Sequence, residues 1–157
     1  MTSQPTEATF EYDASVIGVE VTIGTFDITP ERVAGYLKAT GETNPLYTDE
    51  AAAKASPYGG LIVPPGILQT VSMTGAPNAK VKFGNFAMHS GQRMEVMGPI
   101  RVGDAISVAA DVKEVYAKTG RSGTMVFEVR RNTFRNQHGE TVAVSEMSMV
   151  HRQAGGG

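Results

Sequence analysis

The sequence predicts an α+β protein in which a helix packs against one face of a curved antiparallel sheet. The first half of the chain, to about residue 75, carries helix-start and helix-stop signals. The second half, from about residue 84, alternates apolar and polar residues as strands do. One strand, then helices, then an antiparallel meander is the element order of an α+β fold. A β-barrel that carries an inserted helical segment is the alternative.

The first two elements are a strand and a helix. Apolar and polar residues alternate over 19–26, which predicts a strand. Thr29, Pro30 and Glu31 then supply a hydroxyl N-cap, a proline at the first helical position and an acidic residue in the first turn. Gly41 is expected to end this helix, because glycine is the usual residue just past a helix C-terminus.

Two further helices are expected before the sheet continues. Residues 41–47 are expected to form a loop, and the alanine-rich residues 49–55 a short helix. Residues 56–60 contain a proline and two glycines, which predict a turn. Residues 64–66, Pro-Pro-Gly, begin the next helix, and its apolar stripe predicts that it continues to about Thr74.

The second half is predicted to form a four-stranded meander. Its clearest alternation is Ile106, Val108, Ala110 and Val112. The connecting segments are rich in the residues that hairpin turns use, such as glycine and asparagine. The expected strands cover residues 86–97, 105–116, 124–134 and 141–151.

Composition and charge exclude several classes of function. A formal net charge of −2, with no run of Lys or Arg, argues against nucleic acid or an anionic membrane as the main partner. The chain has no cysteine and therefore no disulfide, thiol nucleophile or cysteine-bound metal. Residues 1–14 lack the features of a signal peptide, and no apolar run approaches the roughly 20 residues that span a bilayer. We expect a cytoplasmic protein with one domain over 15–152 between flexible ends at 1–14 and 153–157.

Three ordered motifs resemble a known family. Residues 40–49, Thr-Gly-Glu-Thr-Asn-Pro-Leu-Tyr-Thr-Asp, are similar to the hydratase loop of MaoC-like proteins. Residues 58–66, Tyr-Gly-Gly-Leu-Ile-Val-Pro-Pro-Gly, resemble the aromatic-glycine pair and helix start that follow in that family. Residues 99–104, Pro-Ile-Arg-Val-Gly-Asp, resemble its Pro-x-x-x-Gly-Asp turn. The chain is identified as a member of the MaoC-like dehydratase and enoyl-CoA hydratase family, and 58–65 resembles its FAS1-like or N-terminal MaoC branch.

This resemblance implies a hot-dog fold, in which an antiparallel sheet wraps around a central helix. It also implies a dimer with thioester sites between its two units, formed with a second copy or with another hot-dog subunit. The implied reaction is the reversible addition of water to a trans-2-enoyl thioester. Coenzyme A or the phosphopantetheine of a carrier protein is then part of the substrate, and no separate cofactor is required.

Dehydration of a 3-hydroxyacyl thioester needs a base, an acid and donors that polarise the thioester carbonyl. By the resemblance, Glu42 and Tyr47 stand where the family has a catalytic aspartate and histidine. Glu42 keeps a carboxylate and is expected to act as a base or to orient water. Tyr47, whose unperturbed pKa is about 10, is expected to donate a proton or a hydrogen bond.

The helix start also differs from the family. Pro65 falls where the family donates a backbone N–H to the thioester carbonyl, and proline has none. The N–H of Gly66, in the first helical turn, is expected to take over that role. Asn44 and Tyr58 are further expected to line the substrate site, and Asn44 with Pro45 also fits an Asx-type turn.

The three histidines differ in what is expected of them. His89 lies in a predicted strand and is the candidate replacement acid or base, with a structural role as the alternative. His138 and His151 receive no role, and the three are too scattered to predict a metal site. Arg121 and Ser122 lie in a loop and are candidates to meet coenzyme A phosphates, with ordinary exposed loop residues as the alternative.

Three functions therefore compete. The first is an enoyl-thioester hydratase or 3-hydroxyacyl-thioester dehydratase with Glu42 at its centre. The second is a non-catalytic hot-dog subunit that completes the acyl site of a catalytic partner. The third is a hot-dog thioesterase, and a specialised synthase or isomerase is a further use of the same scaffold. The Asn-Pro loop and the Pro-x-x-x-Gly-Asp turn favour the first function over the third.

Overall fold

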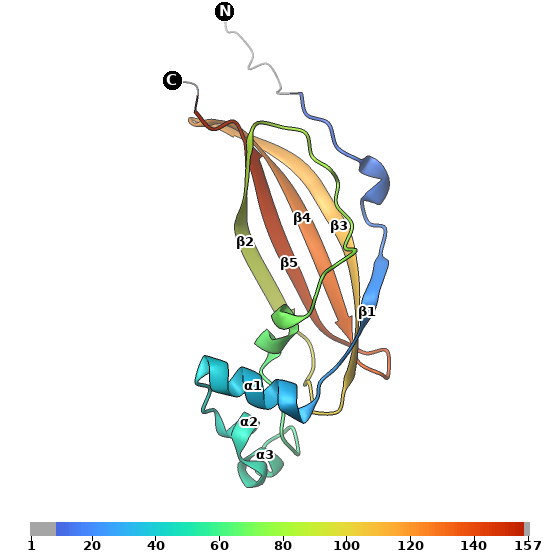
Figure 1. Cartoon of the computed structure of the whole chain (residues 1–157), viewed down its shortest axis with the longest axis vertical. Helices are drawn as coiled ribbons and strands as arrows, with labels where there is room; N and C mark the ends of the chain where they lie inside the picture. The colour runs from blue at the N-terminus through green and yellow to red at the C-terminus, as the bar shows by residue number, and fades with distance from the viewer. Residues whose placement is uncertain (1–8, 156–157) are drawn as a thin grey trace, which may run out of the picture.

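A curved, fully antiparallel sheet of five strands forms the body of the molecule (Figure 1). The computed structural model describes residues 9–155. The strands are β1 (Val21–Asp27), β2 (Phe86–Val96), β3 (Ala105–Gly120), β4 (Gly123–Arg135) and β5 (Thr141–Arg152). Their order across the sheet is β1-β3-β4-β5-β2, so β1 and β2 are the edge strands. The predicted α+β class is confirmed, but the predicted four-stranded meander is only partly right. Strands β3, β4 and β5 form a meander, whereas β2 pairs with β5 and not with β3, so residues 97–104 are a crossover and not a hairpin.

Three short α-helices gather at one end of the sheet (Figure 1). They are α1 (Pro30–Thr40), α2 (Pro45–Thr48) and α3 (Glu50–Ala55), and two 3₁₀ helices, η1 (Ala14–Val16) and η2 (Pro65–Thr70), complete the set. The Thr29 hydroxyl accepts a hydrogen bond from the Arg32 N–H at 3.2 Å, and Gly41 ends α1 with a left-handed φ of 66°. Both predicted boundaries of α1 are confirmed. No helix among residues 9–155 is long and apolar enough to cross a membrane.

Two predicted boundaries were wrong. The helix expected to continue to Thr74 is η2, which ends at Thr70 and has 3₁₀ geometry. The Thr70 hydroxyl donates to the Ile67 carbonyl at 2.7 Å, which competes with helical hydrogen bonding, and Val71 is already extended. The loop expected over 41–47 instead contains the start of α2, because the Asn44 side chain caps it by accepting from the Leu46 N–H at 3.0 Å.

An extended segment, residues 71–85, follows η2 and crosses the inner face of the sheet (Figure 1); we call it the strap. The Ala79 N–H donates to the Glu128 carboxylate on β4 at 2.8 Å, and Ala79 is fully buried. Lys82 exchanges two backbone hydrogen bonds with Glu11, and the Asp13 N–H donates to the Ala79 carbonyl at 2.7 Å. Part of the terminus expected to be flexible, 9–13, therefore lies against the strap, whereas residues 1–8 and 156–157 lie outside the described residues.

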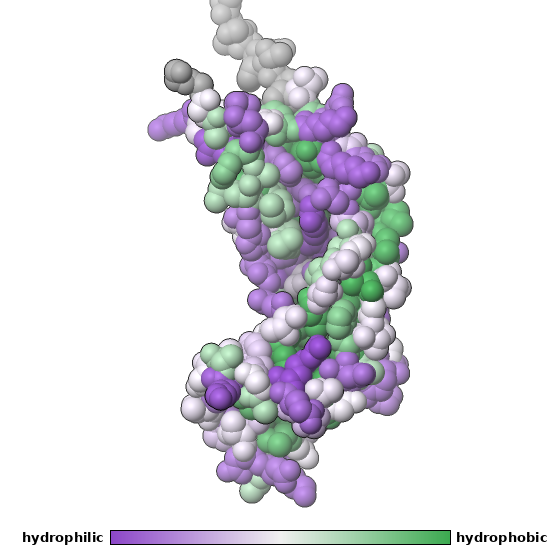
Figure 2. All heavy atoms as spheres, in the orientation of Figure 1, coloured by the Kyte–Doolittle hydropathy of each residue, from purple (hydrophilic) through white to green (hydrophobic). Residues whose placement is uncertain are grey.

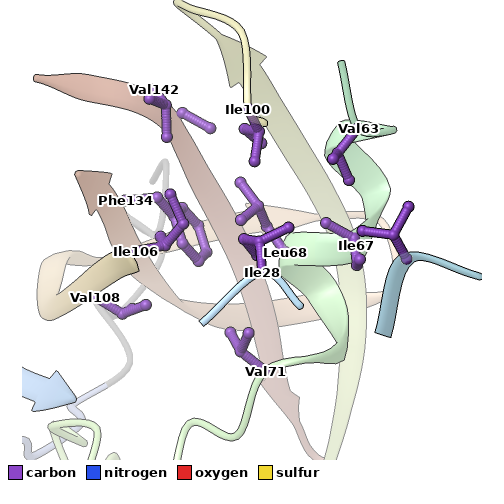
Figure 3. Close-up of a cluster of buried hydrophobic side chains, with 12 residues drawn as sticks. Ile28, Val63, Ile67, Leu68, Val71, Ile100, Ile106, Val108, Phe134 and Val142 are labelled. Carbon is purple, nitrogen blue, oxygen red and sulfur yellow. The ribbon is translucent and has the colours of Figure 1, made fainter. Parts of the chain in front are cut away.

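The hydrophobic core lies between η2, the start of α1 and the adjacent half of the inner sheet face (Figure 3). Phe134 is its largest fully buried side chain, with 1% of its surface exposed. Alternation along β4 directs Phe134 inward and its neighbours outward, as a strand's two-residue period requires. The buried members are Ile28, Val33, Val63, Ile67, Leu68, Val71, Ile100, Ile106, Val108, Phe134, Val142 and Ala143.

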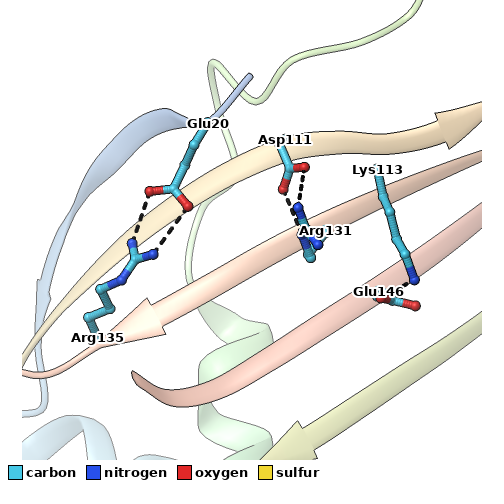
Figure 4. A network of polar contacts seen from close by, with 6 residues as sticks. All are labelled: Glu20, Asp111, Lys113, Arg131, Arg135 and Glu146. Carbon is cyan, nitrogen blue, oxygen red and sulfur yellow. Dashed lines mark hydrogen bonds and ion pairs between the residues drawn. The ribbon is translucent and has the colours of Figure 1, made fainter. Parts of the chain in front are cut away.

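The outer face of the sheet carries paired charges instead (Figure 4). Arg131 on β4 makes two hydrogen bonds to Asp111 on β3, at 3.0 and 2.7 Å. Lys113 pairs with Glu146 at 2.7 Å, and Arg135 pairs with Glu20 at 3.1 and 3.2 Å. Only the Asp111 carboxylate is buried among these six groups, so this pair contributes most to holding β3 and β4 in register.

Phe134→Ala tests the position of the core. Loss of the buried ring and the cavity left behind should lower the free energy of unfolding by about 3–5 kcal/mol. Val19→Ala is the control, because Val19 is 52% exposed and lies outside the five strands, and its replacement should change stability by about 0.5 kcal/mol or less. Urea denaturation of both variants measures the difference, and equal losses would contradict this assignment of the core.

Candidate active site

The Glu42 carboxylate is held by its own loop. One carboxylate oxygen, Oε1, accepts from the Thr43 N–H at 3.0 Å and from the Asn44 N–H at 2.9 Å. The Glu42 N–H in turn donates to the Leu37 carbonyl at the end of α1, at 3.2 Å. The second oxygen, Oε2, accepts no hydrogen bond from residues 9–155, and the side chain is half-buried. Glu42 therefore offers one fixed oxygen and one that is open to a ligand or to water.

The Tyr47 phenol lies close to this carboxylate. Burial raises the pKa of Tyr47 above its ordinary value, and the negative charge of Glu42 raises it further, with smaller contributions from Tyr58 and Tyr36. These interactions place Glu42 and three tyrosines within electrostatic reach of one another. The raised pKa keeps the Tyr47 hydroxyl protonated across the neutral range, so it is able to donate a hydrogen bond and is unsuited to act as a base.

The start of η2 presents a backbone N–H beside a tyrosine hydroxyl. Pro65 has no N–H, and the N–H of Ile67 donates to the Pro64 carbonyl at 3.1 Å. Among the described residues, the Gly66 N–H has no acceptor, as expected in the first turn of a helix. The Tyr36 hydroxyl occupies the space that a Cβ on residue 66 would need. Glycine at this position therefore permits the close approach of α1 to η2.

Arg101 joins the 99–104 motif to the 58–66 motif. Its guanidinium donates to the Tyr58 carbonyl at 2.5 Å and to the Leu61 carbonyl at 3.4 Å. Its backbone N–H donates to the Asp104 carboxylate at 2.8 Å. The Val63 N–H donates to the Ile100 carbonyl in the 99–104 turn, and the Ile62 N–H donates to the Leu46 carbonyl in α2. The segment that carries Tyr58 and leads to η2 is thus fixed from both sides.

The structure brings together most of the residues that the sequence singled out. Glu42, Tyr47, Asn44 and Tyr58 lie around the helical end, and Pro65 and Gly66 form the adjoining first turn of η2. Asn44 acts both as the cap of α2 and as a donor to Glu42. These six residues form the candidate active site.

His89 and the 121–122 turn lie elsewhere in the chain. His89 pairs with Met149 near the start of β2. Seven residues of strand, roughly 23 Å, separate it from Val96 and from the turn that contacts the helical end. Arg121 and Ser122 are exposed at the tip of the β3–β4 hairpin, at the far end of the sheet from the helices (Figure 1). Within one chain, none of these residues meets Glu42.

Sequence reasoning assigned no site role to Tyr36 or Arg101. Tyr36 shares the apolar stripe of α1 with Val33 and Leu37, and its spacing indicates packing alone. Arg101 lies inside a turn motif where a charged residue is unremarkable, and its partners are 40 and 43 residues away. Both contacts depend on tertiary structure, so no local pattern identifies them.

A pocket at the helical end does not contain the candidate site. It has a volume of about 490 Å³ and lies between the 97–104 turn and the β4–β5 hairpin. Arg101 lines it, together with Asp104, His138 and Glu140, whereas neither Glu42 nor Gly66 does. Its polar groups are largely satisfied by one another, as in the bond from Gln137 to Asp104 at 3.0 Å. We therefore place the candidate chemistry at Glu42 and Gly66 and not in this pocket.

Comparisons with known proteins give the fold and the family. Residues 15–145 match the family described as "FAS1-like, dehydratase domain region". A UPF0336 protein of Streptomyces avermitilis is 26% identical over 135 residues, which cover 82% of this chain and 87% of that protein. The ChsH1–ChsH2 complex of Mycobacterium tuberculosis matches with a TM-score of 0.69 and 18% identity, over 92% of this chain and 89% of that one. An R-hydratase of Pseudomonas aeruginosa matches with a TM-score of 0.62 and 17% identity, over 93% and 90%. The predicted hot-dog fold is confirmed, with η2 in place of a long central helix.

Gly66→Ala tests the contact between α1 and η2. A Cβ at residue 66 meets the Tyr36 hydroxyl, and we expect the free energy of unfolding to fall by about 1–3 kcal/mol. Tyr36→Phe removes the obstructing oxygen and should recover part of this loss in the double variant, with a coupling energy of about 0.5–3 kcal/mol. Additive effects in a denaturation double-mutant cycle would show that the two groups do not touch.

Proposed function

Since the chain belongs to the FAS1-like dehydratase-domain family, we propose that it binds acyl thioesters and catalyses reversible addition of water to a trans-2-enoyl thioester. One observation carries the proposal. The Tyr47 phenol is within electrostatic reach of the Glu42 carboxylate and of Tyr36, and the Tyr36 hydroxyl lies against Gly66, whose N–H has no acceptor among the described residues. This reaction requires a base, a hydrogen-bond donor and a further donor that polarises the thioester carbonyl.

The Gly66 N–H is suited to the thioester oxygen. As water adds to carbon 3, the double-bond electrons move toward the carbonyl and negative charge develops on its oxygen. A fixed N–H stabilises that charge more than it stabilises the neutral carbonyl, which lowers the barrier. The close packing of Tyr36 on Gly66 holds this donor in place before substrate arrives.

Glu42 is suited to move the proton in both directions. Its open oxygen takes a proton from the attacking water as the new C–O bond forms, and the resulting carboxyl group then delivers that proton to carbon 2. Atoms balance, because one water molecule is added and Glu42 returns to its carboxylate form. Tyr47 is a poor proton source because its pKa is raised, and it instead orients the water by hydrogen bonding.

A binding subunit is the second candidate function. The separation of His89 from Glu42 favours it, because one chain alone does not place an imidazole at the helical end. The ChsH1–ChsH2 structure is a complex of two different chains, which supports the same reading by analogy. In this alternative the chain binds part of the acyl thioester while a partner supplies the acid and base.

Strand β2 is the proposed contact with that partner. It is an edge strand of eleven residues, and Phe86, Met88 and Val96 on it are 45–50% exposed. Figure 2 shows apolar side chains gathered over the upper part of this edge. A long, apolar, unpaired edge favours pairing with another strand. We infer that a second hot-dog chain pairs with β2, and that for the protein alone this is a second copy.

Glu42→Gln tests the catalytic proposal. Loss of the enoyl-thioester absorbance should be followed on a panel of trans-2-enoyl-CoA substrates. We expect Glu42→Gln to lower kcat about 100-fold or more, and Tyr47→Phe to lower it about tenfold. Glu31→Gln is the matched control, because Glu31 is exposed in α1, and it should leave the rate unchanged.

Other outcomes of this assay identify the alternatives. No turnover by the folded wild-type chain, with thioester binding retained, would establish the binding-subunit function. Release of free thiol would instead indicate hydrolysis of the thioester. Full activity of Glu42→Gln would overturn the role proposed for this carboxylate.

Met88→Lys tests the partner contact. A charge on the β2 edge opposes strand pairing, so the molar mass from sedimentation equilibrium should fall toward that of one chain. Val102→Lys is the control, because Val102 is 42% exposed but lies outside the strand, and its mass should equal that of the wild type. An unchanged mass in Met88→Lys, or a monomeric wild type, would contradict pairing through β2.

A further inference from the structure

Two adjoining hollows lie between η2, the strap and the inner face of the sheet. The first, of about 220 Å³, begins at Leu68 on η2, two residues after Gly66. The second, of about 130 Å³, shares Met73, Asn132 and Met147 with the first and extends to Arg130. The first has room for about seven groups the size of water. A ligand whose carbonyl meets Gly66 therefore has a place for its chain beside the same short helix.

The floor of these hollows is polar in its middle. Asn132 on β4 and Ser145 on β5 are directly opposed, and the Asn132 amide donates to the Ser145 hydroxyl at 3.3 Å. Ser145 is 6% exposed and Asn132 is half-buried. Both lie on the inward face between the apolar Phe134 and Met147. A purely hydrocarbon chain in the hollow would form no hydrogen bond with Asn132 or Ser145. It would also displace water from these two groups, which costs free energy.

Arg130 adds a hydrogen-bond donor at the inner end. One guanidinium nitrogen pairs with Glu128 at 2.9 Å, and Glu128, 1% exposed, also accepts from the Ala79 N–H of the strap. The Arg130 Nε is buried and has no acceptor among the described residues. A buried N–H without an acceptor is costly, and because Arg130 lines the second hollow, a ligand oxygen that reached this N–H from there would satisfy it.

We propose that the two hollows select acyl chains that carry a hydrogen-bond-accepting oxygen, such as a keto group, several bonds beyond the thioester. The proposal rests on the proposed function and names its substrate class. The thioester carbonyl lies at Gly66, the chain passes Leu68 and Met73, and the distal oxygen accepts hydrogen bonds from Asn132 and Arg130. Plain aliphatic chains of the same length bind less tightly because they offer no acceptor to the Arg130 Nε or to the second N–H of the Asn132 amide.

Saturated coenzyme A thioesters test the selectivity without requiring turnover. Decanoyl-CoA and its 7-, 8- and 9-oxo derivatives should be titrated by calorimetry into the full chain, in the assembly that it forms in solution. We expect at least one oxo derivative to bind about five times more tightly than decanoyl-CoA, with the gain depending on the position of the keto group.

Two variants locate the selectivity. Asn132→Leu removes the donor itself, and Ser145→Ala removes the hydroxyl that orients the Asn132 amide. In both variants the preference for the oxo chain should fall below about twofold, with the affinity for decanoyl-CoA retained or raised. Ser148→Ala is the matched control, because Ser148 lies on the same strand but pairs with Val129 on the outer face, and it should keep the preference. Arg130 is left intact because its removal would leave Glu128 buried without its ion-pair partner. The Ser145 variant removes a single oxygen and stands as the test if Asn132→Leu does not fold.

The outcomes separate this inference from the proposed reaction. Equal binding of plain and oxo chains overturns the inference, whether or not enoyl-CoA is hydrated. No binding of any of the four thioesters to the folded protein overturns it as well. A preference that is lost in both inner-face variants supports it, even where no turnover is observed and the hydration proposal fails.

Discussion

Two consecutive prolines determine how the helical end of the molecule is built. Pro64 and Pro65 supply no backbone N–H, so the first donor that η2 presents is that of Gly66. The absence of a Cβ at Gly66 lets the Tyr36 hydroxyl close on it, and this contact sets the separation of α1 from η2. The loop that carries Glu42 follows directly from the end of α1, so its position relative to the Gly66 donor depends on the same contact. Arg101 then fixes the segment leading into the prolines from the opposite side.

Glu42 is the carboxylate that acts on the Tyr47 phenol. Two backbone N–H groups hold one oxygen of Glu42 and leave the other open, while burial and that same negative charge keep Tyr47 protonated. A carboxylate can take up and release a proton during the reaction, whereas a phenol whose pKa is raised stays protonated. The two groups are therefore suited to different roles. In the proposed mechanism Glu42 carries the proton, and Tyr47 and Gly66 bind the oxygen atoms that change charge or position. The short η2 also leaves space along the inner sheet face, where the polar Asn132 and the partly satisfied Arg130 face the hollows.

Local signals in the sequence predicted what local chemistry determines. The cap at Thr29, the left-handed Gly41 and the alternation along the strands each act within a few residues, and the structure has them all. The extent of η2 was not predictable from its apolar stripe, because the Thr70 hydroxyl competes for the backbone. Long-range relations were also beyond local reasoning. The contacts of Tyr36 and Arg101 join distant segments, and the distance of His89 from Glu42 depends on the direction in which β2 crosses the sheet. The family motifs that carry Glu42, Asn44, Tyr47 and Gly66 lie at one end of the molecule, because the fold brings the 40–49 and 58–66 segments together.

The central claim is that the Gly66 N–H polarises a thioester carbonyl. Isotope-edited infrared difference spectroscopy measures this directly, with a trans-2-enoyl-CoA labelled with carbon-13 at the thioester carbonyl. Our account predicts that the carbonyl band of the bound thioester lies at lower frequency than the band of the same thioester in water, because a fixed donor weakens the C=O bond. A bound thioester whose carbonyl band lies at or above its frequency in water would show that no such donor acts on it, and would contradict the account.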